Sequence, residues 1–110
     1  MADKVVVIIA TKEKEKAITG MMYAKNAAKN KWLKDVKVVF FGPAEKLIAE
    51  DEEAGAYAAD IAQLTETYAC KYLSDRDNIS DKIRKQNIKI EYVGTIISDY
   101  VKDGYETMVW

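Results

Sequence analysis

The first expected strand constrains the fold of this chain more than any other stretch. Residues 4–10 read Lys-Val-Val-Val-Ile-Ile-Ala, a run of mostly β-branched side chains with no alternating polar positions. A strand with this pattern is buried on both faces, as in parallel sheets that are covered by helices. The run therefore predicts a parallel sheet with helices packed on its faces.

Patterns along the rest of the chain alternate between strand and helix. We expect strands over residues 4–10, 36–41, 66–70, 88–93 and 105–110. We expect helices over residues 12–34, 44–50, 56–64 and 95–101, and two shorter helices between residues 71 and 87. This alternation predicts one α/β domain over residues 1–110 with a five-stranded, mostly parallel sheet. The resulting three-layer α/β/α architecture is flavodoxin-like.

Local features refine three of these boundaries. Thr11 is expected to cap the first helix, since its hydroxyl can accept a hydrogen bond from an N–H of the first turn. The apolar stripe of that helix is expected to run as far as Trp32. Residues 51–53 are expected to form a solvated acidic turn, and Gly55 to break the chain before the next helix.

Composition excludes several kinds of chemistry. The chain has no histidine and one cysteine, so the usual Cys/His zinc sites cannot form within one subunit. Ser-His-Asp and Cys-His catalysis are excluded for the same reason. We therefore expect no metal, no cofactor and no histidine-dependent catalysis, and whether the protein is an enzyme stays open.

The residues after each strand exclude further kinds of site, because sites in parallel α/β domains lie at the carboxyl ends of the strands. The first strand runs into Ala-Thr-Lys-Glu-Lys, with no glycine to let the backbone wrap a phosphate. This excludes dinucleotide, P-loop and flavin-phosphate binding of the usual kind. A phospho-receiver domain requires acidic residues after the first and third strands. This chain has Thr11 and Cys70 there, so the sequence does not fit a phospho-receiver domain.

The thiol of Cys70 is the remaining candidate for chemistry. It ends the third strand and faces the start of a helix, whose free N–H groups and dipole favour a thiolate. Lys71 adds a nearby cation. The alternative is that Cys70 is a small buried hydrophobe, the commonest state of a free cysteine. The neighbouring strand ends supply further candidates for a pocket lining, which turn and cap formation explain equally well: Thr11, Gly42, Pro43, Lys71, Gly94 and Thr95.

The order of the elements and three short motifs resemble the DsrE/DsrF-like family, small α/β proteins of bacterial and archaeal sulfur relay. The likeness covers nearly the whole chain and includes Phe41-Gly42-Pro43, Tyr68-Ala69-Cys70 and Lys102-Asp103-Gly104-Tyr105. The resemblance implies that Cys70 carries sulfur as a persulfide and that the strands are ordered 4-3-2-1-5. It also implies a homo-oligomer, a trimer or a hexamer, with sites near subunit contacts.

Two main functional hypotheses follow. The first is a sulfur carrier that accepts sulfur on Cys70 from a donor protein and passes it to a partner thiol. The alternative is a non-catalytic oligomeric interaction module or small-ligand-binding module of the same fold. A third hypothesis is a small enzyme whose active site is shared between subunits.

Location and partners are constrained only broadly. A lone cysteine rules out an intrachain disulfide and fits a reducing cytoplasm. We expect no signal peptide, and no apolar run approaches the ~20 residues that a membrane span requires. Residues 12–37 carry eight lysines against three acids, and residues 45–66 carry seven acids against one lysine. The basic and acidic segments are either solvated helix faces or complementary patches that dock subunits or partner proteins. The slightly acidic net charge of −1 does not favour a nucleic-acid partner.

Overall fold

The structure is a computed structural model that describes residues 3–110. Within this range, strands and helices alternate along the chain as the sequence predicts. The strands are β1 (Lys4–Ile9), β2 (Asp35–Phe40), β3 (Thr67–Cys70), β4 (Lys89–Glu91) and β5 (Glu106–Val109). The helices are α1 (Lys14–Lys29), α2 (Pro43–Glu50), α3 (Glu52–Leu64), α4 (Lys71–Arg76), α5 (Ser80–Arg84) and α6 (Val93–Lys102).

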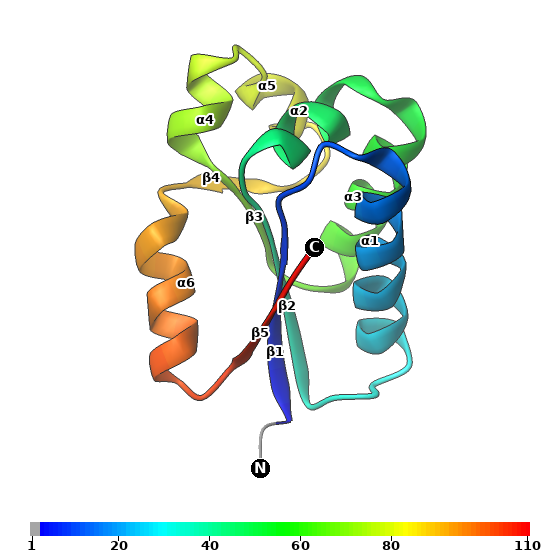
Figure 1. Cartoon of the computed structure of the whole chain (residues 1–110), viewed down its shortest axis with the longest axis vertical. Helices are drawn as coiled ribbons and strands as arrows, with labels where there is room; N and C mark the ends of the chain where they lie inside the picture. The colour runs from blue at the N-terminus through cyan, green and yellow to red at the C-terminus, as the bar shows by residue number, and fades with distance from the viewer. Residues whose placement is uncertain (1–2) are drawn as a thin grey trace.

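The five strands form one sheet in the order β4-β3-β2-β1-β5. Every pairing is parallel, so the sheet is entirely parallel rather than mostly parallel. This confirms the predicted α/β fold and the strand order that the family resemblance implies. Because all strands point the same way, their carboxyl ends meet along one edge, which we call the carboxyl edge. Figure 1 shows the sheet edge-on, with α4 and α5 beyond the ends of the strands.

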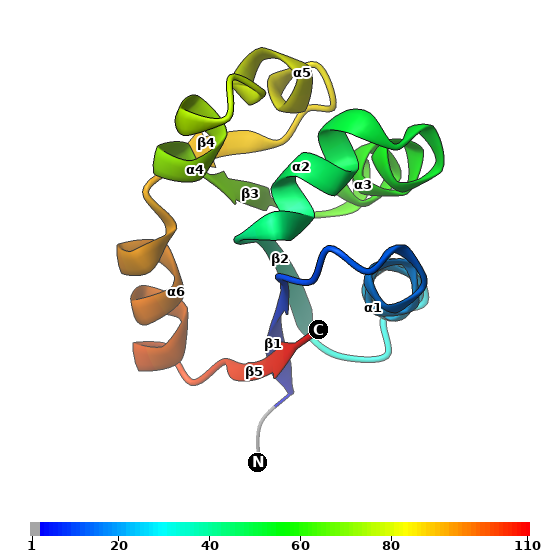
Figure 2. The same cartoon turned by 45° about the horizontal axis from the view of Figure 1, so that its top comes forward.

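One face of the sheet carries the larger part of the core. Helices α1, α2 and α3 lie on this side in Figure 2. Ile83 of α5 and Ile79, the residue just before that helix, belong to the same cluster. The alternate residues Val5, Val7 and Ile9 of β1 point into it, and the helices fill it with alanines and isoleucines. The small side chains let the helices lie close to the strands.

The other face is covered mainly by α6 (Figure 1). Its cluster is smaller and consists of Val6, Ile8, Val39, Cys70 and Val93. Three tyrosines, an isoleucine and a leucine pack against this cluster from its margins. Cys70 thus contributes its side chain to the thinner layer of the domain.

Helix α1 is shorter than the sequence predicts. It begins at Lys14, with Glu13 in the capping position, so the expected cap at Thr11 is wrong. The Thr11 hydroxyl instead accepts a hydrogen bond from the Glu13 N–H at 3.1 Å, within the loop that precedes the helix. The helix ends at Lys29, and the expected core residue Trp32 is 58% exposed. The apolar pattern continues past the helix, because Trp32 packs against Tyr23 from the following loop.

Helix α3 is longer than predicted, and Gly55 lies inside it. The helix starts at Glu52, because the Asp51 carboxylate caps it by accepting a hydrogen bond from the Ala54 N–H at 2.9 Å. Gly55 serves a close approach between helices rather than a break. A Cβ at this position would lie 2.7 Å from the carbonyl oxygen of Ile48 in α2. The predicted acidic turn is therefore the cap and first turn of α3.

Candidate functional site

Cys70 lies at the carboxyl edge, as the sequence predicts. It is the last residue of β3 and the residue immediately before α4. Its neighbour in the sheet register is Glu91 of β4, two residues before the start of α6. The side chain is 7% exposed and packs with Val93, the first residue of α6. The thiol is therefore mostly buried, next to the starts of two helices.

Sequence inspection missed a buried ionisable group at this edge, Glu45 in the first turn of α2. Its side chain is 1% exposed. One carboxylate oxygen, Oε1, accepts a hydrogen bond from the hydroxyl of Ser74 in α4 at 2.6 Å. The other, Oε2, accepts one from the N–H of Gly42 at 3.1 Å. Glu45 therefore joins the end of β2 to the helix that follows Cys70.

The surroundings of Glu45 alter its acidity. Burial raises the pKa of the Glu45 carboxyl to about 7, because a buried carboxylate loses its hydration. The Ser74 hydroxyl and the backbone N–H groups of Gly42 and Cys70 oppose this increase, while Asp77 adds to it. A carboxyl group that titrates near neutrality thus lies against the backbone of Cys70.

A capping signal for Glu45 was present in the sequence. A glutamate three residues after a turn commonly reaches back to the N–H of the capping residue, and Gly42 has a φ of 95° that favours glycine. The burial was not visible, because it depends on Ser74, which lies 29 positions further along the chain.

A groove of about 620 Å³ runs along the carboxyl edge between α2 and α4. We call it the α2–α4 groove. Of the predicted pocket residues, Gly42 and Pro43 contribute to its walls, and Thr11 is adjacent to the lining residue Lys12. The lining consists of Lys12, Gly42, Pro43, Lys46, Leu47, Glu50, Leu73, Arg76 and Asp77. Leu73 also packs against the cluster that contains Cys70, so the groove and the thiol are neighbours.

The other predicted pocket residues have different roles. The Lys71 ammonium pairs with Asp75 at 2.7 Å, which raises the pKa of Lys71 and directs its charge along α4. Gly94 and Thr95 lie in the exposed first turn of α6, which begins at Val93, two residues before the predicted start of this helix. The helix begins earlier because Val93 is buried against the sheet and starts the first turn.

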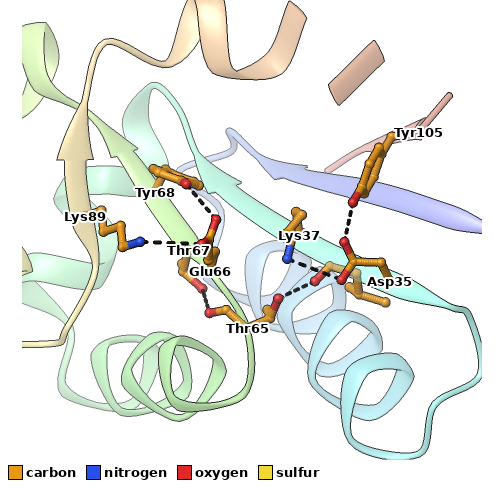
Figure 3. Close-up of polar contacts among 9 residues, drawn as sticks. Asp35, Lys37, Thr65, Glu66, Thr67, Tyr68, Lys89 and Tyr105 are labelled. Carbon is orange, nitrogen blue, oxygen red and sulfur yellow. Dashed lines mark hydrogen bonds and ion pairs between the residues drawn. The ribbon is translucent and has the colours of Figure 1, made fainter. Parts of the chain in front are cut away.

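A separate group of polar side chains lies at the opposite edge of the sheet. Glu66 immediately precedes β3, and Lys89 is the first residue of β4. Figure 3 shows both Tyr68 and Lys89 reaching Glu66. The Tyr68 hydroxyl donates to Oε2 at 2.8 Å, and the Lys89 ammonium lies 3.6 Å from Oε1. Burial and this carboxylate together raise the pKa of Tyr68 above its ordinary value.

The same edge holds a second link, between β2 and the loop before β5. Asp35 accepts a hydrogen bond from the Tyr105 hydroxyl and pairs with the Lys37 ammonium at 3.3 Å (Figure 3). Burial raises the pKa of Tyr105, and Asp35 adds to the increase. These groups lie at the amino ends of the strands, so we interpret them as structural ties rather than as part of the site.

Residues 3–110 contain no group of three or more acidic or cysteine side chains close enough together to hold a metal ion. None of the helices in this range combines the length and the apolar character needed to cross a membrane.

Comparisons with known proteins establish the fold and nothing finer. No family model matches the chain, and no curated protein matches it. A solved structure of a conserved protein of unknown function from Bacteroides thetaiotaomicron is similar, with a TM-score of 0.90. The match covers 98% of this chain and 95% of that chain at 23% sequence identity. The class that the fold and its carboxyl edge define is a three-layer α/β/α domain with a parallel sheet.

Proposed function

We propose that this protein is a DsrE/DsrF-like sulfur carrier of the cytoplasm that holds sulfur as a persulfide on Cys70. The observation that supports this most is the position of the thiol. Cys70 is the last residue of β3 at the carboxyl edge, where parallel α/β domains build their sites. The lone cysteine has no disulfide partner within the chain, which fits a reducing compartment.

The chemistry of such a carrier needs only one accessible thiolate. The Cys70 thiolate attacks the outer sulfur of a donor persulfide, R–S–SH. A new S–S bond forms to Cys70, the donor S–S bond breaks, and the donor leaves as a thiolate with the bonding electron pair. The product is Cys70–S–SH. An acceptor thiolate then attacks that outer sulfur and releases the Cys70 thiolate, so no external oxidant or reductant is consumed.

Access to the thiol determines where a donor approaches. The Cys70 side chain is 7% exposed, and its neighbours Leu73 and Val93 cover it from α4 and α6. A donor must therefore approach between the starts of these helices, or after a small displacement of α4. Because the chain has one cysteine, a persulfide on it has no second thiol in the subunit with which to form an internal disulfide. These features favour a carrier over a self-contained reductase, and homo-oligomers such as the trimers or hexamers of the resembled family fit the same proposal.

A labelling experiment tests the proposal. The native protein is incubated with a persulfide donor and then digested for peptide mass spectrometry. The proposal predicts a mass increase of about 32 Da, one sulfur atom, on the peptide that contains Cys70. The Cys70→Ser variant should show no increase. The control variant Ser98→Ala changes an exposed position of α6 and should behave like the native protein. A native protein that gains no sulfur, and whose thiol resists iodoacetamide, contradicts the proposal.

The α2–α4 groove supports a second candidate, a small-ligand-binding module of the same fold. The groove combines apolar residues such as Leu47 with the ammonium groups of Lys12 and Lys46. Neither lysine forms an ion pair with another described residue. Clefts of this size at the carboxyl edge are usual ligand sites. Titration of labelled protein with a panel of small carboxylates, followed by NMR, tests this candidate, and shifts confined to groove residues would support it.

A further inference from the structure

Helices α2 and α4 form opposite walls of the groove, and one buried polar contact joins them below it. Glu45 extends from the first turn of α2, and Ser74 lies in α4. Their side chains are 1% and 0% exposed, and Glu45 Oε1 lies 2.6 Å from Ser74 Oγ. Contact between these two helices is otherwise small, since α4 has only six residues.

The Glu45 carboxylate has no ion-pair partner among residues 3–110. The charged groups that act on it lie at the end of α4, where Arg76 and Asp77 pair with each other at 3.1 Å. The N–H groups of Gly42, the residue that caps α2, and of Cys70, the last residue of β3, face the carboxylate. Ionising a buried group in this setting is costly unless water reaches it.

We propose that Glu45 and Ser74 form a latch that holds α4 against α2 while Glu45 is protonated and releases α4 locally as Glu45 ionises. The direction follows from hydration. An ionised Glu45 gains solvation when α4 moves away, whereas a protonated Glu45 gains little. This gain outweighs the stronger hydrogen bond that the Ser74 hydroxyl donates to the ionised carboxylate, because burial is the larger effect on Glu45. Because α4 follows Cys70 without an intervening residue, its release also exposes the thiol and widens the groove.

The latch regulates the proposed sulfur site, but it does not require Cys70 to carry sulfur. Local release is measured by hydrogen exchange and sulfur transfer by mass spectrometry, so the two proposals fail separately. If Cys70 gains no sulfur while α4 opens with pH, the carrier fails and the latch stands. If Cys70 gains sulfur while α4 stays closed at every pH, the latch fails and the carrier stands.

The test is amide hydrogen exchange of the native protein at pH 6 and pH 8, followed by NMR and corrected for intrinsic rates. The informative amides are those of Asp77 and Ile79, which donate to the carbonyls of Leu73 and Ser74. Between pH 6 and pH 8 a group with a pKa of about 7 when closed, and an ordinary value when open, lowers the closing constant about tenfold. We expect protection of these amides to fall by that factor.

Two variants and one internal reference complete the experiment. Glu45→Gln keeps the shape without the charge, so protection of α4 should not change with pH. Glu15→Gln removes a charge from an exposed position of α1, away from the groove, and should leave the tenfold fall intact. Amides of β1 exchange through global unfolding, which also exposes Glu45, so their protection should fall by a similar factor but stay well above that of the α4 amides at both pH values. Equal protection of the α4 amides at both pH values, an unaltered pH effect in Glu45→Gln, or protection of α4 as high as that of β1 would overturn the latch.

Discussion

Glu45 and Ser74 are 29 positions apart in the sequence, yet their side chains share a 2.6 Å hydrogen bond that is fully shielded from solvent. Buried charged groups are rare in small domains unless they are paired. This one has hydrogen-bond donors but no ion-pair partner among the described residues, and it lies against the backbone of the only cysteine. We therefore expect the stability of the protein to depend on pH through Glu45 and to fall when Glu45 or Ser74 is substituted.

Glu45→Gln should change how stability depends on pH. The pKa of Glu45 is raised from 4.5 in the unfolded chain to about 7 in the folded one, so proton binding favours the folded state. This stabilisation is complete below pH 4.5 and is lost as pH rises through about 7. The free energy of unfolding of the variant, relative to the native protein, should rise by roughly 2 to 3 kcal/mol between pH 5 and pH 8. Urea denaturation across this range measures it, and a constant difference would show that Glu45 has an ordinary acidity.

Ser74→Ala should destabilise the protein more at pH 8 than at pH 5. The change removes the hydroxyl that donates to Glu45 Oε1 and leaves a buried carboxylate with one donor fewer. The loss should cost about 1 to 3 kcal/mol when Glu45 is ionised and less when it is protonated. Ser98→Ala, at an exposed site on α6, is the control and should change stability by about 0.5 kcal/mol or less. Equal costs at the two pH values would refute the assigned interaction.

Gly55→Ala and Gly94→Ala should have opposite effects although both glycines lie in helices. A Cβ at Gly55 would lie 2.7 Å from the Ile48 carbonyl oxygen and 2.8 Å from Gln86 Nε2. We expect the variant to lose about 1 to 3 kcal/mol, as overpacked sites do. A Cβ at Gly94 meets nothing within 4 Å, so alanine should stabilise α6 by about 0.5 to 1 kcal/mol. Thermal denaturation of both variants measures this, and a stabilised Gly55→Ala would show that α2 and α3 can separate at little cost.

The layer order and the position of Cys70 could be predicted from the sequence because they depend on local signals. The β-branched run that becomes β1 specifies a buried parallel strand, and Cys70 ends β3 as expected. The strand order came from the family resemblance, since periodicity alone does not fix it. Proposals on sulfur chemistry and oligomeric state stay predictions.

The remainder of the site depends on contacts between distant segments. The burial of Glu45 requires α4 to close over it, and Ser74 lies far along the chain. Gly55 looked like a helix breaker because its packing partner, the Ile48 carbonyl, is invisible to a pattern search. Lys71 looked like a cation for the thiol, but its partner is Asp75, one helical turn ahead.

Tyr105→Phe should lower stability without affecting the proposed site, because Tyr105 lies at the amino ends of the strands and Cys70 at the carboxyl edge. The change removes the hydroxyl that donates to Asp35 and leaves the Lys37–Asp35 pair in place. We expect a loss of about 1 kcal/mol in unfolding free energy and no change in the amount of sulfur bound to Cys70. Denaturation and the labelling assay provide the two measurements. Reduced sulfur loading in a folded variant would mean that the amino edge takes part in the site.

Sulfur transfer through Cys70 is tested most directly by a pulse and chase. The native protein is loaded with a persulfide donor, freed of donor, and mixed with an excess of a small thiol while its intact mass is followed. The account predicts a gain of about 32 Da that disappears during the chase while an equal amount of persulfide forms on the small thiol. A protein that never gains the mass, or that keeps it throughout the chase, would contradict the account.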